Sequence, residues 1–90
     1  MQISDAKKEK ISEQILALLY SNFPKSLFTS KIAKEIARDE EFVKSLLNTL
    51  KKKSLINEVK KNSKGISYLK RARWKLGDEA YLAYKEYQKF

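Results

Sequence analysis

The 90-residue sequence contains no cysteine and no histidine. Disulfide bonds, thiolate metal sites and the imidazole used in most general acid–base catalysis are therefore excluded. Its two glycines provide no phosphate-cradling loop, and neither a cofactor nor a metal is implied. The acidic clusters 39–41 and 78–79 fall at expected helix starts, where capping explains them. An enzyme is thus the least favoured class of function.

Long apolar runs are also missing, since none reaches the roughly 18 residues that a membrane-spanning helix needs. Residues 1–10 lack the apolar core of a signal peptide. We therefore expect a cytoplasmic protein, associated with the nucleoid if it binds DNA. The length and an apolar content of 42% predict one folded domain over residues 1–90. Scarce Cys and Met beside abundant Lys and Glu favour a thermophilic source.

The net charge of +9 is concentrated in one segment. Residues 51–77 contain 10 Lys or Arg and 1 Asp or Glu, whereas the rest of the chain contains 10 of each kind. Such a block is typical of proteins that bind a polyanion, most often nucleic acid. Solubility and the lysines of a heat-adapted protein offer another explanation, but neither requires so one-sided a segment.

Residues 40–53 are predicted to form the helix around which the other elements are arranged. The apolar residues recur with the i, i+3, i+4, i+7 spacing of one helix side: Val43, Leu46, Leu47 and Leu50. Asp39 is a good N-cap, and Glu40 and Glu41 suit the positive end of the helix dipole. The opposite side carries amide, hydroxyl and ammonium groups, which are the groups that read base edges.

Three elements are expected before this helix. The first is a helix over about residues 5–20, followed by Pro24, which cannot continue it. The second is a short extended stretch at 27–29. The third is a helix capped by Thr29 or Ser30, with an apolar stripe whose alanines would let another helix cross closely: Ile32, Ala33, Ile36 and Ala37.

A basic hairpin and a last helix are expected after it. The apolar residues of 55–61 and an alternating pattern at 66–76 predict two strands joined by a turn at 62–65. This hairpin forms a wing over about residues 55–76. Asp78 caps a helix over about 78–89, in which tyrosines recur every three residues. They either seal the small core or form a homodimer interface, for which the candidates are Leu16, Tyr20, Tyr81, Tyr84 and Tyr87.

The order of these elements resembles the winged helix-turn-helix family, over nearly the whole chain. The matching residues are Ile32–Ala33, Ile36–Ala37, Val43, Leu47, Leu50 and Leu55–Ile56, with Trp74–Lys75–Leu76 like the end of a wing. The last helix looks like that of dimeric bacterial or archaeal regulators of the PadR or MarR type. Ser54 departs from the family's usual glycine, and Glu40 and Glu41 replace its Ser, Thr or Arg. The resemblance implies an α+β, mostly α fold, with a helix-turn-helix at about 29–53.

The family further implies double-stranded DNA as ligand, with the third helix in the major groove and the wing beside it. Outward residues of that helix are the candidates for reading bases: Lys44, Ser45, Asn48, Thr49 and Lys52. Phosphate contacts are expected from Lys31, Lys34, Lys51, Lys60, Lys61, Lys64, Arg71 and Arg73. Occupancy of a site by a homodimer would regulate transcription, and no small-molecule ligand is implied.

Other functions stay open. The same chain could coat DNA as a chromatin protein or serve in plasmid partition. The acidic start of the third helix favours a protein-interaction module, which the basic wing disfavours. Tyr68 and Trp74 could stack on bases of RNA or single-stranded DNA, but Trp74 shares a strand face with core residues.

Overall fold

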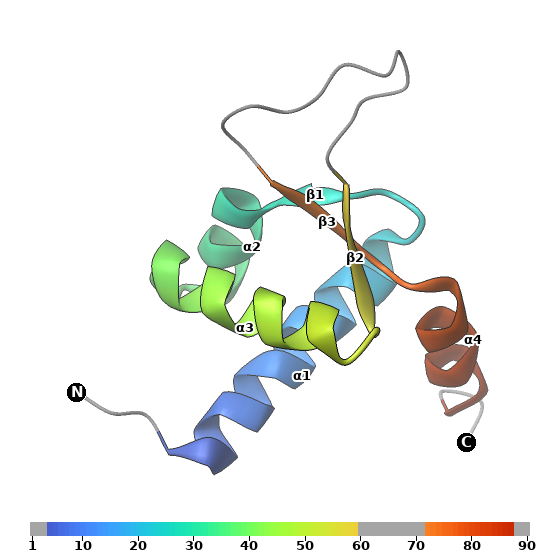
Figure 1. Cartoon of the computed structure of the whole chain (residues 1–90), viewed down its shortest axis with the longest axis horizontal. Coiled ribbons are helices and arrows are strands. Elements are labelled where there is room, and N and C mark those ends of the chain that lie inside the picture. Colours follow the sequence, from blue (N-terminus) through green and yellow to red (C-terminus); the bar gives the residue numbers. More distant parts are fainter. Residues whose placement is uncertain (1–3, 60–71, 88–90) are drawn as a thin grey trace.

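The computed structural model describes residues 4–59 and 72–87 of the chain (Figure 1). Its elements in order are α1 (Asp5–Asn22), β1 (Leu27–Phe28), α2 (Thr29–Ile36), α3 (Glu40–Lys52), β2 (Ile56–Val59), β3 (Arg73–Leu76) and α4 (Asp78–Tyr87). This α+β, mostly α arrangement and the helix-turn-helix formed by α2 and α3 confirm the predicted fold. The predicted turn at 62–65 and the adjoining parts of the wing, residues 60–71, lie outside the described residues.

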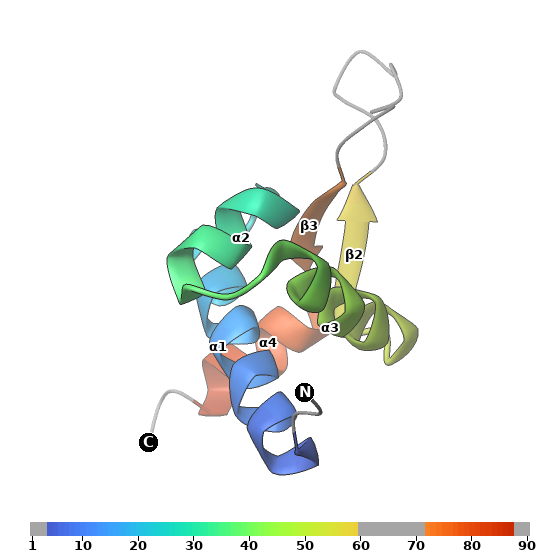
Figure 2. The ribbon, with the colours of Figure 1, turned by 90° about the vertical axis from the view of Figure 1, so that its left-hand side faces the viewer.

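The strands form one antiparallel sheet in the order β1-β3-β2. Leu27 pairs with Trp74, and Trp74 pairs with Glu58 on its other side. The short extended stretch before α2 is therefore a third strand of the wing's own sheet. Figure 2 shows β2 and β3 leaving the helical body side by side, next to α3. The sheet thus fixes the base of the wing against the segment that leads into α2.

The hydrophobic core lies between the three helices and this sheet. Its fully buried members come from five elements: Ile15, Leu19, Ile32, Val43, Leu47, Ile56, Trp74 and Leu76. All four apolar residues of the α3 stripe are buried, as the spacing predicted. Burial of one helix side in this way is what holds α3 in place and leaves its other side free.

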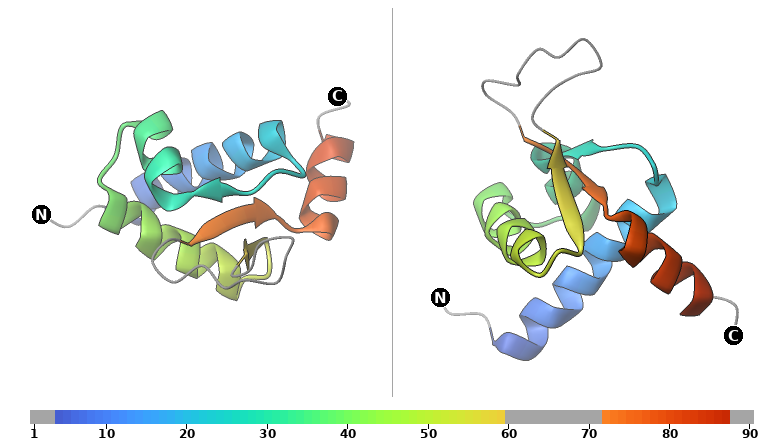
Figure 3. Two further views of the ribbon diagram at one scale, coloured as in Figure 1. Left: turned by 90° about the horizontal axis from the view of Figure 1, so that it is seen from above. Right: turned by 45° about the vertical axis from the view of Figure 1, so that its right-hand side comes forward.

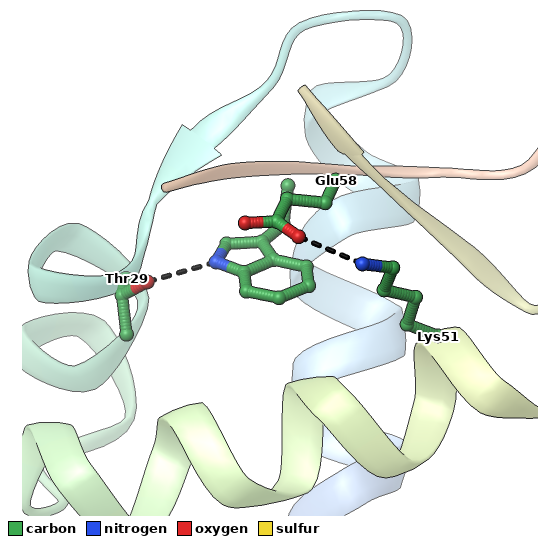
Figure 4. A network of polar contacts seen from close by, with 4 residues as sticks. Thr29, Lys51 and Glu58 are labelled. Carbon is green, nitrogen blue, oxygen red and sulfur yellow. Dashed lines mark hydrogen bonds and ion pairs between the residues drawn. The ribbon is translucent and has the colours of Figure 1, made fainter. Parts of the chain in front are cut away.

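Trp74 is part of this core and only 1% exposed. Its indole Nε1–H donates a hydrogen bond of 2.8 Å to the Thr29 hydroxyl, across from β3 to the first residue of α2 (Figure 4). A buried indole N–H needs such an acceptor. Trp74 is therefore a core residue and not a platform for stacking bases.

The start of α2 differs from the prediction. Its N-cap is Phe28, and no side chain accepts a hydrogen bond from the helix's first N–H groups. The Thr29 hydroxyl is buried and bound to Trp74, so it does not cap the helix. The cap of α3 is as expected, because Asp39 Oδ2 accepts from the Phe42 N–H at 3.1 Å.

Two helices end at a non-glycine residue with left-handed backbone. Ala37 has φ 55° and Ser54 has φ 62°. In each case the next N–H reaches back over the last turn: Arg38 donates to the Ala33 carbonyl and Leu55 donates to the Leu50 carbonyl. Ser54 thus follows α3 in the left-handed conformation, which favours glycine. Ala37 is exposed in this turn, so the prediction that it allows a close helix crossing was wrong.

Candidate nucleic-acid interface

The outward side of α3 is polar and fully accessible. All five residues predicted to read bases are exposed: Lys44, Ser45, Asn48, Thr49 and Lys52. They project from a helix whose opposite side is fixed in the core. This combination gives a helix that is held by the core and carries exposed polar side chains, which is what insertion into a DNA groove requires.

The five residues nevertheless belong to two different rows. Ser45 and Thr49 line a groove of about 680 Å³ between α3 and the N-terminal half of α1. Their hydroxyls donate to carbonyls of their own helix, those of Phe42 at 2.6 Å and of Ser45 at 3.1 Å. The α1 wall of the groove includes the carboxylates of Glu9 and Glu13. The negative wall makes this row the less suitable one for a DNA edge.

Lys44, Asn48 and Lys52 do not line that groove. They follow one another at i, i+4, i+8 and therefore form one row along α3, which we call the outer row. An Asn amide can pair with the N6 and N7 of adenine, and a Lys ammonium can donate to guanine. Among the predicted residues, the outer row is thus the part best placed to contact base edges.

The end of α3 is tied to the base of the wing by an ion pair. Lys51 Nζ lies 2.8 Å from Glu58 Oε1 on β2 (Figure 4). The side chain of Lys51 is 43% exposed and that of Glu58 only 19%. Glu58 was not among the predicted site residues, although it is the only acidic residue between positions 51 and 77. That isolation was the signal that could have marked it.

The lysines of α2 are exposed, as expected for phosphate contacts. Lys31 Nζ lies 2.8 Å from Glu35 Oε1, one turn further along the helix. The hydrogen bond from Lys31, and then its charge, lower the pKa of the Glu35 carboxyl. Lys34 lowers this pKa further by its charge. Exposed ion pairs of this kind contribute little to stability, so the lysine can readily exchange the carboxylate for another anion.

Arg73 packs against β1. Its guanidinium carbon lies 4.9 Å from the centre of the Phe28 ring, and its Nη2 donates to the Ser26 carbonyl at 3.4 Å. A phosphate contact by Arg73 stays a prediction. The remaining predicted phosphate contacts lie outside the described residues: Lys60, Lys61, Lys64 and Arg71.

The candidate dimer residues separate into those that pack within the chain and one that is exposed. α4 packs at the C-terminal end of α1, on the other side of the molecule from α2 (Figure 3). The Tyr20 ring lies 4.5 Å from that of Tyr84 and 5.3 Å from that of Tyr81, which also stacks on Phe23 at 4.0 Å. Leu16 packs on the core. In contrast, Tyr87 is 77% exposed.

Metal-ligand groups and membrane-spanning helices were considered for the described ranges 4–59 and 72–87. These ranges contain no group of three acidic, Cys or His residues that could hold a metal ion. None of the helices described here is both long and apolar enough to cross a membrane.

The comparisons with known proteins rest on structure alone. No protein-family model and no curated protein sequence matches the chain. The structure of the S. aureus MepR–DNA complex matches with a TM-score of 0.72 and 22% identity, over 94% of this chain and 69% of that chain. ZitR of Lactococcus lactis, a zinc-responsive MarR family member, matches with a TM-score of 0.66 and 18% identity, over 99% and 54%.

A third match is NadR in complex with 4-hydroxyphenylacetate, with a TM-score of 0.68 and 22% identity, over 97% of this chain and 54% of that chain. The chain therefore spans little more than half the length of ZitR and NadR. NadR also shows that a protein of this fold can bind a small molecule, which the sequence of this chain had not implied. The chain has the winged helix-turn-helix fold found in MarR-type regulators.

Proposed function

We propose that the chain binds double-stranded DNA and regulates transcription by occupying a site. In this proposal α3 lies in the major groove and the basic segment that follows it contacts the backbone. The observation that carries the proposal is the outer row Lys44, Asn48 and Lys52. It is exposed along a helix whose opposite side is buried in the core.

Two further observations support DNA as the ligand. The excess positive charge of the chain begins at the C-terminal turn of α3 and continues along the sequence through residues 60–75. The MepR structure with the same fold is a complex with DNA. Charge beside a reading helix is how such proteins obtain sequence-independent affinity.

We further propose that the regulator is a homodimer formed through α4. The supporting observation is that Leu82 and Tyr87 are 60% and 77% exposed, although both are large and apolar or aromatic. A dimer would place two copies of α3 about one DNA turn, roughly 34 Å, apart and so read a pseudo-palindrome.

The proposal is tested by fluorescence anisotropy of labelled duplex DNA, titrated across salt. Two DNAs are compared: pooled random duplexes and the region upstream of the protein's own coding sequence. If each protomer neutralises about six phosphates, log K falls with log salt at a slope near −5. Preference for the upstream region identifies a self-regulating, site-specific binder. Equal, steep binding to both would instead identify a coating or partition protein.

A protein-interaction module is the second candidate. Glu40 and Glu41 are exposed at the first turn of α3 and oppose a phosphate backbone there. Absence of binding to either DNA at low salt would contradict DNA recognition and favour this candidate.

A further inference from the structure

The ion pair between Lys51 and Glu58 lies beside the outer row. Lys51 follows Asn48 by three residues and Lys44 by seven, and residues with these spacings are neighbours on a helix surface. Its ammonium is 2.8 Å from the Glu58 carboxylate. The pair therefore sits in the corner between α3 and the base of the wing, next to the proposed DNA surface (Figure 4).

The two partners differ in freedom. Glu58 is on β2, in register with Trp74 on the central strand, and Trp74 is 1% exposed. The backbone of Glu58 is thus held by the sheet, and the Glu58 side chain is 19% exposed. Lys51 has a long flexible stem and a side chain that is 43% exposed. Glu58 is therefore the more constrained partner of the pair and Lys51 the more flexible one.

The Lys31–Glu35 pair provides a contrast within the same chain. Both of its members are on α2, one turn apart, with side chains 54% and 44% exposed. A phosphate can replace Glu35 there at little cost. Glu58 is more buried and comes from a different element, so it competes more strongly for its lysine.

We propose that Glu58 withholds Lys51 from the DNA backbone and so lowers the sequence-independent affinity of the protein. The proposal rests on the proposed DNA-binding function. The pair has no net charge, and in this state Lys51 neutralises no phosphate. Each neutralised phosphate contributes about 0.9 to the slope of log K against log salt. Removal of the carboxylate charge adds one cation to the binding surface.

The test measures salt dependence with random duplex DNA for the full chain and for Glu58→Gln. Glutamine keeps the shape of the side chain and can accept a hydrogen bond from Lys51. We expect the slope to become steeper by about 0.9 and the affinity at 0.1 M salt to rise on the order of fivefold. Circular dichroism verifies that the variant is folded.

Three controls isolate the pair. Glu79→Gln removes the same charge from an exposed position on α4 and should leave the slope unchanged. Lys51→Gln removes the lysine of the pair and is the reference for the double variant. Glu58→Gln should have no effect on the slope in the Lys51→Gln background.

The outcomes separate the two proposals. If the unmodified chain binds DNA but Glu58→Gln has the same slope, or if Glu58→Gln steepens the slope equally in the Lys51→Gln background, the role of Glu58 is wrong while DNA binding stands. If Glu79→Gln steepens the slope as much, the effect is one of total charge and the inference also fails. If the unmodified chain does not bind at low salt, both proposals fail.

Discussion

Thr29 shows how one side chain acquires its role from a distant partner. Its hydroxyl accepts a hydrogen bond from the Trp74 indole, and both residues are buried. We expect Thr29→Val to lower the free energy of unfolding by about 1–3 kcal/mol, because the indole N–H would then be buried without an acceptor. Urea denaturation followed by circular dichroism measures this loss.

Thr29→Ser is the matched control, since it keeps the hydroxyl and removes only a methyl group. Its cost should stay near 0.8 kcal/mol, the value for one buried carbon. Equal losses in the two variants would mean that packing and not the hydrogen bond is what Thr29 provides.

Asn48 is the central residue of the outer row and is exposed. Its replacement by alanine removes an amide that can pair with one base. We expect Asn48→Ala to weaken binding to the preferred DNA by about 1–3 kcal/mol and to leave binding to random duplexes unchanged. Anisotropy titrations on both DNAs check this, with Gln14→Ala on the exposed side of α1 as control. An equal loss on random DNA would rule out base reading by Asn48.

At the residue scale, the sequence predicted which side chains are buried better than it predicted their hydrogen-bond partners. The alternation in β3 indicated that Trp74 faces the core, and the structure confirms it. The same reasoning assigned Thr29 to a helix cap. In a sequence, a threonine that caps a helix cannot be distinguished from one that accepts a hydrogen bond from a distant residue. Its actual partner is 45 residues away, and no local pattern encodes that distance.

The ends of α2 and α3 are the points where the elements carry backbone strain. Ser54 has φ 62°, in the left-handed region where a side chain is unfavourable. We expect Ser54→Gly to raise the free energy of unfolding by roughly 0.5–1 kcal/mol, since relief of strain exceeds glycine's entropy cost. Thermal unfolding by circular dichroism measures the gain.

The same substitution inside a helix should act in the opposite direction. Ser12 lies in the middle of α1, and Ser12→Gly should lower the free energy of unfolding by about 0.5–1 kcal/mol. If Ser54→Gly were also destabilising, the strain at the end of α3 would be smaller than the entropy that glycine adds to the unfolded chain.

The basic segment after β2 is expected to act on every DNA sequence alike. Reversal of the charges of Lys61 and Lys64 should weaken binding to preferred and random DNA by the same factor, because phosphate contacts carry no sequence information. Salt titrations of the double variant measure this factor and the accompanying decrease in slope. Unchanged affinity at low salt would remove these lysines from the interface.

Element bounds followed from periodicity and caps where these signals were strong. The apolar spacing and the Asp39 cap predicted α3 to within one residue of its end. α1 continues to Asn22, two residues beyond the prediction, because Pro24 restricts only the residue before it and residue 22 can still be helical. The left-handed turn at Ala37 was not predicted, because alanine carries no turn signal.

At the scale of the molecule, the proposed association of two chains depends on α4. Tyr81 and Tyr84 are engaged with Tyr20 in the same chain, so a partner subunit would meet mainly Leu82 and Tyr87. We expect the double change Leu82→Ser and Tyr87→Ser to convert the proposed dimer into a monomer, while the free energy of unfolding stays nearly unchanged. Light scattering after size-exclusion chromatography checks the molar mass, with Glu79→Gln as a surface control on the same helix.

The distribution of charge along the sequence predicted which segment is basic, but it did not predict the ion pair within that segment. Counting charges marked residues 51–77 as strongly basic, and the family resemblance implied a DNA contact for Lys51. The fold instead brings Glu58 of that segment against Lys51. Likewise, the tyrosine repeat did not show which rings pack within the chain: Tyr81 and Tyr84 lie against Tyr20, and Tyr87 is exposed. Which side chains meet across elements is a property of the tertiary structure.

The burial of Trp74 also makes the chain its own spectroscopic probe. It is the only tryptophan, it is 1% exposed, and it connects β3 to the start of α2. Its emission therefore reports on the junction between the wing and the helix-turn-helix, and not on contact with bases. A shift of that emission on addition of DNA would mean that the wing and the helix-turn-helix move relative to each other. Constant emission would mean that they bind as one rigid unit.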